Sequence, residues 1–157
     1  MYGFLKELEN VLGKQGVDEA LGMLNRRVEC RFTAIFELLD DRLFNKHFYD
    51  RLGQPRAAFL ESVPWVDSFC QIAVREGKLS SPDTAADDRL DYSPYQGIVT
   101  SYHAVPIMDE ALQRVWGTLC HFDVVQTDLT DPQFQELRMS AYLLLPYLRA
   151  EARRSDG

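Results

Sequence analysis

Three cysteines are the side chains with the most reactive chemistry in this sequence. Cys30, Cys70 and Cys120 are far apart and odd in number, which does not indicate a disulfide framework. Cys70 falls at the start of a helix predicted over 68–76, where the helix dipole favours the thiolate and therefore nucleophilic attack. The alternative is a small buried side chain between that helix and a sheet. The cysteine usage favours a reducing, cytoplasmic location.

Other patterns for catalysis or metal binding are missing from the sequence. No G-x-G-x-x-G, complete P-loop, H-E-x-x-H, C-x-x-C or G-x-S-x-G pattern occurs. Cys120 and His121 are adjacent, and neighbours on a strand point to opposite faces, so they do not readily share a metal ion. The pairs Asp40-Asp41 and Asp87-Asp88 lie in predicted turns, where solvated carboxylates are the simplest interpretation. We therefore expect neither an enzyme nor a metal site.

The charge and hydropathy of the sequence exclude two classes of partner. The 157 residues carry a net charge of −7, and the basic residues are scattered. Nucleic acids and anionic membranes bind clustered Lys and Arg side chains, so we expect neither as a partner. The longest strongly apolar stretch, 142–148, is far shorter than the ~20 residues needed to cross a bilayer. The charges within 1–10 do not suit a signal peptide.

The elements that position the reactive side chains are predicted from hydrophobic spacing. Helical spacing predicts two helical pieces within 1–26, a helix over 68–76 ending at Gly77, and a final helix beginning near Asp131. Pro146 lies inside the apolar stripe of the final helix and is expected to kink or end it. Alternating apolar residues predict strands, and a short strand with a capped helical turn is expected within 78–90. The strands are predicted over 32–39, 43–49, 101–108 and 115–124.

These elements predict one domain of the α/β (α+β) class over residues 1–157. The turn residues Asp40-Asp41 join the first two strands into a hairpin, and the short connection 109–114 joins the last two. Hairpins imply an antiparallel sheet, and terminal helices with apolar stripes imply cover for one of its faces. We expect an N-terminal helical segment over 1–26, a core over 28–148 and an exposed tail over 149–157.

Four segments, taken in order, resemble the GAF domain family. They are Ser68-Phe69-Cys70, Asp83 followed by Asp87-Asp88-Arg89-Leu90, Ser101-Tyr102-His103-Ala104-Val105-Pro106, and Gly117-Thr118-Leu119-Cys120-His121-Phe122-Asp123. The last is similar to the family's G-T-L-C-V-I-D strand, and the resemblance covers about 17–148. It implies a six-stranded antiparallel sheet with helices on both faces. It also implies a pocket between the sheet and the segments 68–76 and 82–90, which in this family takes cyclic nucleotides, tetrapyrroles, haem or other small metabolites.

The resemblance implies a set of ligand-binding residues from a helix, a loop and two strands. These candidates are Phe69, Cys70, Asp83, Asp87, Tyr102, Thr118 and Cys120. Asp83 and Asp87 would line the mouth of the pocket or cap the short helix beside it. The alternative is an N-cap for Asp87 and simple sheet packing for Tyr102 and Thr118. A strand register shifted by one residue would turn these side chains to the opposite face.

The sequence departs from the family pattern in two places. Ala104 stands where the pattern has a glycine, and the connection 109–114 lacks the usual turn glycine. Most members are joined to an output domain such as a cyclase or a kinase, and we expect none in this chain. The resemblance implies a homodimer through the terminal helices or docking to a signalling protein as the route for output.

Three functions are consistent with these residues. The first is a stand-alone sensory GAF domain of bacterial type, which binds a small metabolite or nucleotide and requires no known cofactor. The second is a scaffold for protein–protein interaction whose pocket is filled by aromatic side chains. The candidates for filling it are Phe36, Phe44, Phe48, Tyr49, Phe69 and Tyr102. The third is a thiol-based free-methionine-sulfoxide reductase, which needs two cysteines within disulfide reach.

Overall fold

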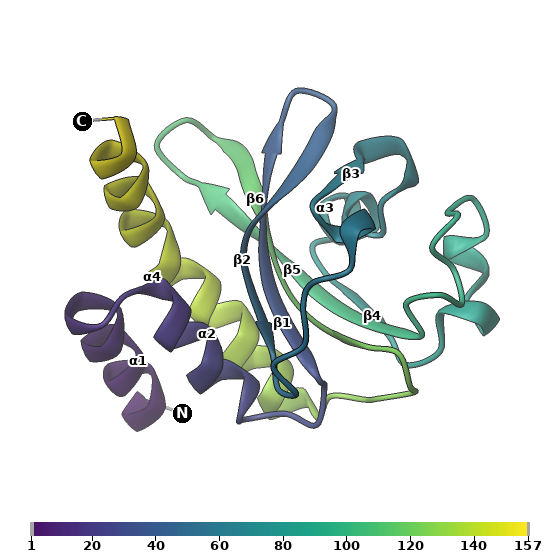
Figure 1. Cartoon of the computed structure of the whole chain (residues 1–157), viewed down its shortest axis with the longest axis horizontal. Coiled ribbons are helices and arrows are strands. Elements are labelled where there is room, and N and C mark those ends of the chain that lie inside the picture. Colours follow the sequence, from purple (N-terminus) through teal and green to yellow (C-terminus); the bar gives the residue numbers. More distant parts are fainter. Residues whose placement is uncertain (1, 157) are drawn as a thin grey trace.

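A twisted antiparallel sheet of six strands forms the centre of the protein (Figure 1). The computed structural model describes residues 2–156, and the side chains of residues 3–154. The strand order across the sheet is β3-β2-β1-β6-β5-β4. The strands are β1 (Phe32–Leu39), β2 (Arg42–Asp50), β3 (Ser62–Pro64), β4 (Leu79–Ser81), β5 (Ser101–Asp109) and β6 (Arg114–Asp123). The α+β class, the antiparallel sheet and the two predicted hairpins are confirmed.

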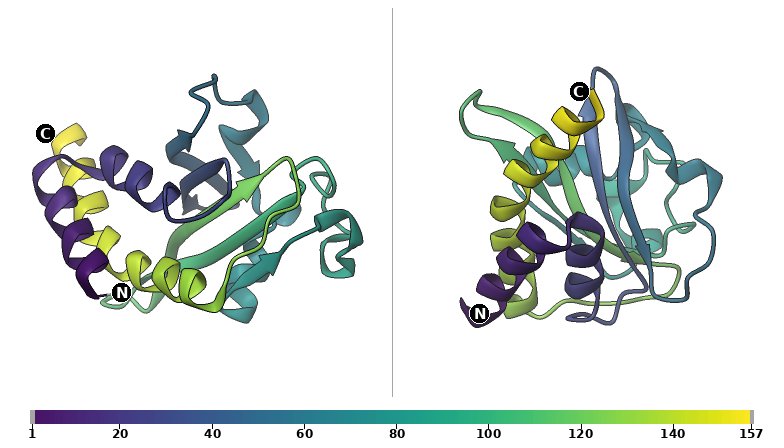
Figure 2. Two further views of the ribbon diagram at one scale, coloured as in Figure 1. Left: turned by 90° about the horizontal axis from the view of Figure 1, so that it is seen from below. Right: turned by 60° about the vertical axis from the view of Figure 1, so that its left-hand side comes forward.

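Helices cover both faces of this sheet, as the resemblance implied. The helices α1 (Tyr2–Lys14), α2 (Val17–Asn25) and α4 (Asp131–Asp156) lie together on one face (Figures 1 and 2). The other face carries α3 (Cys70–Glu76) and four short 3-10 turns. Among the described residues, no helix is both long and apolar enough to span a membrane.

Alternation along the central strands divides the interior into two cores. Ile35 of β1 and Leu119 of β6 pack with α1, α2 and α4, whereas Phe36 and Cys120 pack on the side of α3. Successive side chains of a strand point to opposite faces, so each strand contributes to both cores. The register pairs Phe36 with Thr118 and Tyr102 with Phe122, which turns all four side chains toward α3.

The hydrophobic spacing did not predict β3, which only the resemblance implied. The strand has three residues and pairs with the start of β2 through Arg42, Leu43 and Phe44. Three residues are too few for a period of two to stand out in a sequence, and Pro64 suits an edge strand because it lacks an N–H group. The connection from β2 to α3 therefore contains a sheet edge that was predicted as loop.

The final helix continues well beyond the predicted apolar stripe. It runs through Pro146 to Asp156 and bends along its length in both views of Figure 2. The segment expected as an exposed tail over 149–157 is helical as far as it is described, and Gly157 lies outside the described residues. Arg149 forms an ion pair with the buried Asp109 of β5, and Glu151 lies 2.7 Å from His47 of β2. These polar contacts hold the helix against the sheet where its apolar stripe ends.

Candidate functional site

A small apolar cavity lies between the sheet and α3. Its volume is about 40 Å³, and the sheet contributes Phe36, Leu43 and Tyr102 to its walls. Phe69 and Cys70 enter from the start of α3. The sequence folds in this way locally because Phe36 and Tyr102 occupy alternate, α3-facing positions of their strands, while Gly77 ends α3 in the left-handed conformation at φ 84°.

Two connecting segments form a lid over this cavity. We define the lid as residues 51–69, between β2 and α3, together with residues 82–100, between β4 and β5. The first segment contributes Phe59, Leu60 and Val63 to the cavity walls, and the second contributes Tyr95 and Val99. Val63 belongs to the edge strand β3, and the other four side chains cover the cavity from the connecting segments.

Few interactions hold the two lid segments together. The rings of Phe59 and Tyr95 are stacked with their centroids 5.5 Å apart. The Ser93 hydroxyl donates to the carbonyl oxygen of Asp67 at 2.5 Å, and the Tyr92 hydroxyl donates to that of Ser68 at 2.5 Å. Phe59 is 39% exposed although it lines the cavity. Leu60, Leu90 and Val99 anchor the lid in the core on the α3 side, so we expect opening where the two segments meet.

A polar cluster lies at the floor of the cavity. The Cys70 sulfur is 3.1 Å from the Tyr102 hydroxyl and 3.1 Å from the Thr118 hydroxyl. The Cys120 sulfur lies beneath them and is 3.6 Å from the carbonyl oxygen of Ala34. The Phe69 ring meets the Tyr102 ring edge-on, with centroids 5.2 Å apart. The polar atoms of this cluster bond one another, and the surface that faces the cavity is apolar.

The thiols at this floor are not activated nucleophiles. Burial raises the pKa of the Cys70 thiol, and its hydrogen bonds to Thr118 and Tyr102 offset the rise only in part. Burial also raises the pKa of Cys120 far above its usual range and that of Tyr102 well above its own. Desolvation disfavours the charged form of a thiol or phenol, so these groups are neutral at physiological pH. Of the two interpretations of Cys70, a small buried side chain fits the structure better than a reactive nucleophile.

Cys30 lies apart from this cavity. Its sulfur is 3.2 Å from the Thr127 hydroxyl, and burial raises the pKa of its thiol to about 11. Cys30 does not line the cavity and belongs to neither its wall nor its floor. The three thiols therefore do not converge, although Cys70 and Cys120 both face the α3 side of the sheet.

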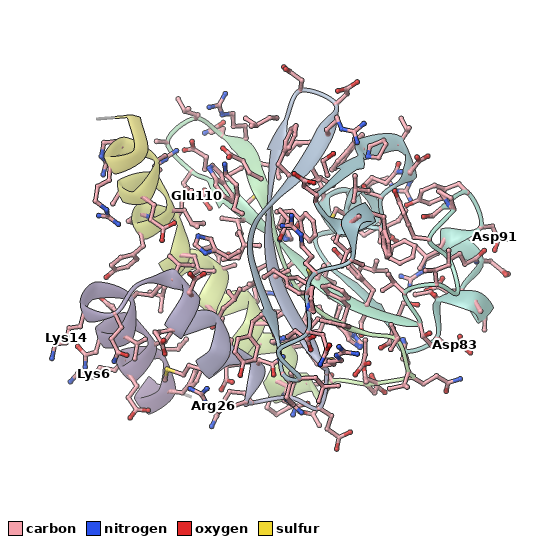
Figure 3. All side chains as sticks on the ribbon, in the orientation of Figure 1. Lys6, Lys14, Arg26, Asp83, Asp91 and Glu110 are labelled. Carbon is pink, nitrogen blue, oxygen red and sulfur yellow. The ribbon has the colours of Figure 1, made fainter. Side chains whose placement is uncertain are left out.

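Asp83 and Asp87 do not line the cavity. The Asp87 carboxylate accepts a hydrogen bond from the Arg89 N–H and caps a 3-10 turn, and it lies 2.7 Å from the Arg89 guanidinium, which lowers the pKa of the carboxyl group. Asp83 lies on the projecting β4–β5 segment, as does Asp91 (Figure 3), and accepts a hydrogen bond from Gln126 at 3.2 Å. Asp87 thus has the capping position weighed as its alternative.

The other five predicted residues lie together at the cavity. Phe69, Cys70 and Tyr102 line it, and Thr118 and Cys120 contact or support them from below. Their role in ligand binding stays a prediction. The lid residues were not identified from the sequence. Their segments have no regular hydrophobic spacing, so the position of these side chains in the fold could not be predicted. The signal available was the occurrence of apolar pairs such as Phe59-Leu60 within otherwise polar loops.

Acidic, histidine and cysteine side chains do not gather around a common point in the part of the chain that the structure describes. No group of three or more of them is placed to hold a metal ion. On β6, Cys120 faces α3 while His121 faces the helical layer, where its Nδ1 lies 2.6 Å from the Thr33 hydroxyl.

Comparison with known proteins identifies the fold. No protein-family model matches the sequence, and no curated protein matches it. The GAF domain of a phosphoenolpyruvate-protein phosphotransferase from Acinetobacter superposes with a TM-score of 0.78 at 12% identity, over 99% of this chain and 97% of that one. A free methionine-R-sulfoxide reductase from Neisseria meningitidis, solved with its substrate, has a TM-score of 0.74 at 16% identity, over 96% and 89%.

A third neighbour is the chromophore-binding domain of a bacteriophytochrome from R. palustris. Its TM-score is 0.71 at 11% identity, and the match covers 99% of this chain and 61% of that chain. Sequence identities this low show a shared fold and carry no function from one protein to another. The neighbours include a GAF domain, a chromophore-binding domain and a sulfoxide reductase, so the fold alone does not decide whether this chain is an enzyme.

Proposed function

Because the chain has the fold of GAF domains, we propose that it is a sensory or regulatory module that binds a small, uncharged and largely apolar molecule. The observation that carries this proposal is the apolar cavity beneath the lid, with Tyr102 and Cys70 as its polar groups. A pocket with apolar walls and a few convergent polar groups is the usual form of a small-molecule site.

The walls of the cavity define the chemistry of this ligand. They contain no charged side chain, and the nearby Arg89 is already paired with Asp87. A phosphate or carboxylate would lose its hydration on entry without gaining a counter-charge, which disfavours nucleotides. Tyr102 stays a neutral phenol because burial raises its pKa, and its hydroxyl would have to leave the Cys70 sulfur to form a hydrogen bond with a polar atom of the ligand.

Ligand entry requires the lid to move. The volume of about 40 Å³ is small beside the roughly 300–1,000 Å³ of typical ligand pockets. Binding therefore separates Phe59 from Tyr95 and enlarges the cavity at the expense of that stack. A ligand acts by binding the open arrangement of the lid more tightly than the closed one, which shifts the population between the two.

A scaffold with a filled pocket is the second candidate, and the small volume favours it. Phe36, Phe69 and Tyr102 occupy much of the space between sheet and α3. Two other residues expected to fill the pocket do not: Tyr49 packs against the helical layer, and Phe44 is 36% exposed. The sensor and the scaffold differ in whether the lid opens to a small molecule.

We do not propose sulfoxide reductase activity for this chain. Such chemistry needs a thiolate that reaches the substrate and a second thiol that resolves the product. Here Cys70 and Cys120 are buried and their pKa values are raised, and Cys30 lies away from the cavity. Their free state accords with a reducing, cytoplasmic location, which is part of the proposal.

The homodimer expected through the terminal helices stays a prediction, and the function proposed here does not depend on it. The outward positions of α1 include the charged Lys6, Glu7 and Glu9, whereas α4 exposes Met139 and Tyr142. A pairing through these helices would therefore rely on α4. In the function we propose, output passes through a second protein in contact with this module.

Binding of indole, measured by isothermal titration calorimetry, tests the proposed site. Val99→Phe places a larger side chain in the cavity, and Val125→Phe makes the same change at a position that is 57% exposed. We expect the Val99→Phe protein to bind indole at least about ten-fold more weakly than the unchanged protein, a loss of about 1.4 kcal/mol. The Val125→Phe protein should bind as the unchanged protein does, and phenyl phosphate should bind to none of them.

Two results would count against the sensor. Equal indole binding by the Val99→Phe and Val125→Phe proteins would place the ligand elsewhere. Absence of binding, together with a higher free energy of unfolding for Val99→Phe, would favour the filled scaffold, since an added side chain then completes a packed core. Circular dichroism of each variant establishes that it is folded before the comparison is made.

A further inference from the structure

A second apolar groove lies outside the ligand cavity, where α3, β5 and α4 meet. Its volume is about 250 Å³. Val74 and Gly77 line it from α3, Pro106 and Met108 from β5, and Tyr142 from α4. It shares no lining residue with the cavity beneath the lid. The groove is therefore a separate surface feature with its own chemistry.

This groove follows an open edge of the sheet. β4 pairs with β5 only from Tyr102 to Ala104, whereas β5 continues to Asp109. Within the described chain, no strand pairs with the outer edge of β5 beyond Ala104. Pro106 lies in this open stretch and has no N–H group to offer, a usual protection of sheet edges against added strands. Pro106 therefore disfavours the addition of a strand at this edge.

Large apolar side chains are exposed along the groove. Tyr142 is 60% exposed and Met108 is 37% exposed, and Met139, one turn before Tyr142 on the outer side of α4, is 38% exposed. Methionine and tyrosine adapt to a partner's surface at low cost, and they are enriched where proteins meet. Their concentration on one helix and one strand edge favours a docking function for this surface.

The charges around the groove are positive in a chain that is negative as a whole. Arg138 lines the groove, and the Lys78 ammonium lies 5.3 Å from the ring centre of Phe134, one helical turn before Arg138. Neither cation forms an ion pair with the residues that the structure describes. Glu76 is the exposed acidic residue at the adjoining end of α3, and Glu136 is paired with Arg27. Lys78 and Arg138 are thus available to pair with the carboxylates of a partner.

We propose that the groove binds an acidic, amphipathic helix of a partner protein. The apolar side of such a helix covers Met108 and Tyr142, and its carboxylates meet Arg138 and Lys78. A helix laid into an apolar groove is a recurring mode of recognition, and complementary charge sets its specificity. A second copy of this chain suits the groove less well, because a two-fold contact centred there would bring two copies of Arg138 and Lys78 to one interface.

The experiment uses two fluorescent peptides of about 18 residues, built from Glu, Leu and Ala. One places Leu at helical spacing, and the other has the same composition in scrambled order. Fluorescence anisotropy measures their binding to the full chain and to two charge variants. The Lys78→Glu/Arg138→Glu protein changes the groove, and Arg26→Glu/Arg153→Glu makes the same charge change at exposed positions elsewhere. Tyr142→Ala is compared with Leu112→Ala, which lies in the β5–β6 turn and is 58% exposed.

The proposal expects the amphipathic peptide to bind at least about ten-fold more tightly than the scrambled one. Binding should weaken at least about ten-fold in Lys78→Glu/Arg138→Glu and in Tyr142→Ala, weaken with added salt, and stay the same in both control proteins. Equal affinity for the two peptides overturns the proposal, as does an equal loss in the control proteins. A dimer in sedimentation that Tyr142→Ala dissolves would assign the groove to a second copy and would also overturn it.

Discussion

Single residues of β6 serve different faces of the sheet. Cys120 packs beneath the cavity between the sheet and α3, whereas the adjacent His121 is bonded to Thr33 on the side of the helices. The sequence predicted this separation from the alternation of side chains along a strand, and the structure confirms it. The same alternation turned Tyr102 and Thr118 toward α3. Chemistry on this sheet is thus divided between two cores that share no side chain.

The helix-facing core contains a pair of buried histidines, which makes stability depend on pH. His103 and His121 lie opposite each other on β5 and β6. Burial lowers the pKa of His103, and it lowers the pKa of His121 to about 3. A histidine in the unfolded chain has a pKa of about 6.5, so below that pH the unfolded state binds protons that the folded state does not. The free energy of unfolding therefore falls as the pH decreases from about 6.5 toward 3.

We predict that His121→Gln weakens this dependence. Glutamine does not titrate, so the slope of unfolding free energy against pH between about 6 and 4 should fall by up to about 1.4 kcal/mol per pH unit. Urea unfolding at a series of pH values measures the slope. His47→Gln, at a partly exposed histidine bonded to Asp18 and Glu151, is the comparison for a histidine outside this core. A slope for His121→Gln equal to that of the unchanged protein would show that His121 does not cause the loss of stability in acid.

Among the elements, β6 approaches β1 so closely at Gly117 that a side chain does not fit. A Cβ atom at Gly117 would lie 1.9 Å from the carbonyl oxygen of Phe36, which belongs to the backbone of the neighbouring strand. The approach coincides with the bulge between Ile35 and Phe36 in the pairing of β1 with β2. The segment that most resembled the family thus begins with a residue that the sheet geometry requires.

We predict that Gly117→Ala is strongly destabilising. The backbone has to move to admit the methyl group, and we expect a loss of about 3 kcal/mol or more in the free energy of unfolding. Gly13→Ala in α1 is the matched change, because its Cβ would lie 4.0 Å from the nearest atom, the Tyr147 hydroxyl. It should leave stability unchanged or raise it by up to about 1 kcal/mol. Similar unfolding free energies for the two variants would contradict this account of the β1–β6 contact.

Helices and long strands could be predicted from the sequence because the spacing of their apolar residues indicates which face is buried. The period of two over 32–39 and the helical stripe after Asp131 are examples, and both are present. The lid could not be predicted in the same way, since Phe59 and Tyr95 meet only through the fold. Local patterns likewise gave no sign of Arg149 pairing with Asp109, which extends α4 beyond its apolar stripe. The spacing of residues in the sequence therefore does not predict contacts between segments that are irregular and far apart in the chain.

In the whole molecule, the sheet separates a firmly closed side from one that is closed by loops. The helical layer consists of α1, α2 and α4, which pack on one apolar core. The ion pair between Arg27, just after α2, and Glu136 of α4 adds a polar contact within this layer. The α3 side depends on the lid, whose segments are joined by one aromatic stack and a few hydrogen bonds. We therefore expect motion on ligand binding to concentrate where these two segments meet.

Hydrogen exchange followed by mass spectrometry, with and without indole, locates the segments that respond to the ligand. Residues 51–69 and 82–100 should exchange faster than β1 and β6 in the free protein. Indole, which favours the open arrangement of the lid, should speed exchange in these two segments and leave the groove beside α4 unchanged. Protection that is confined to α4, or exchange in the lid that indole leaves unaltered at saturating concentration, would contradict a ligand site beneath the lid.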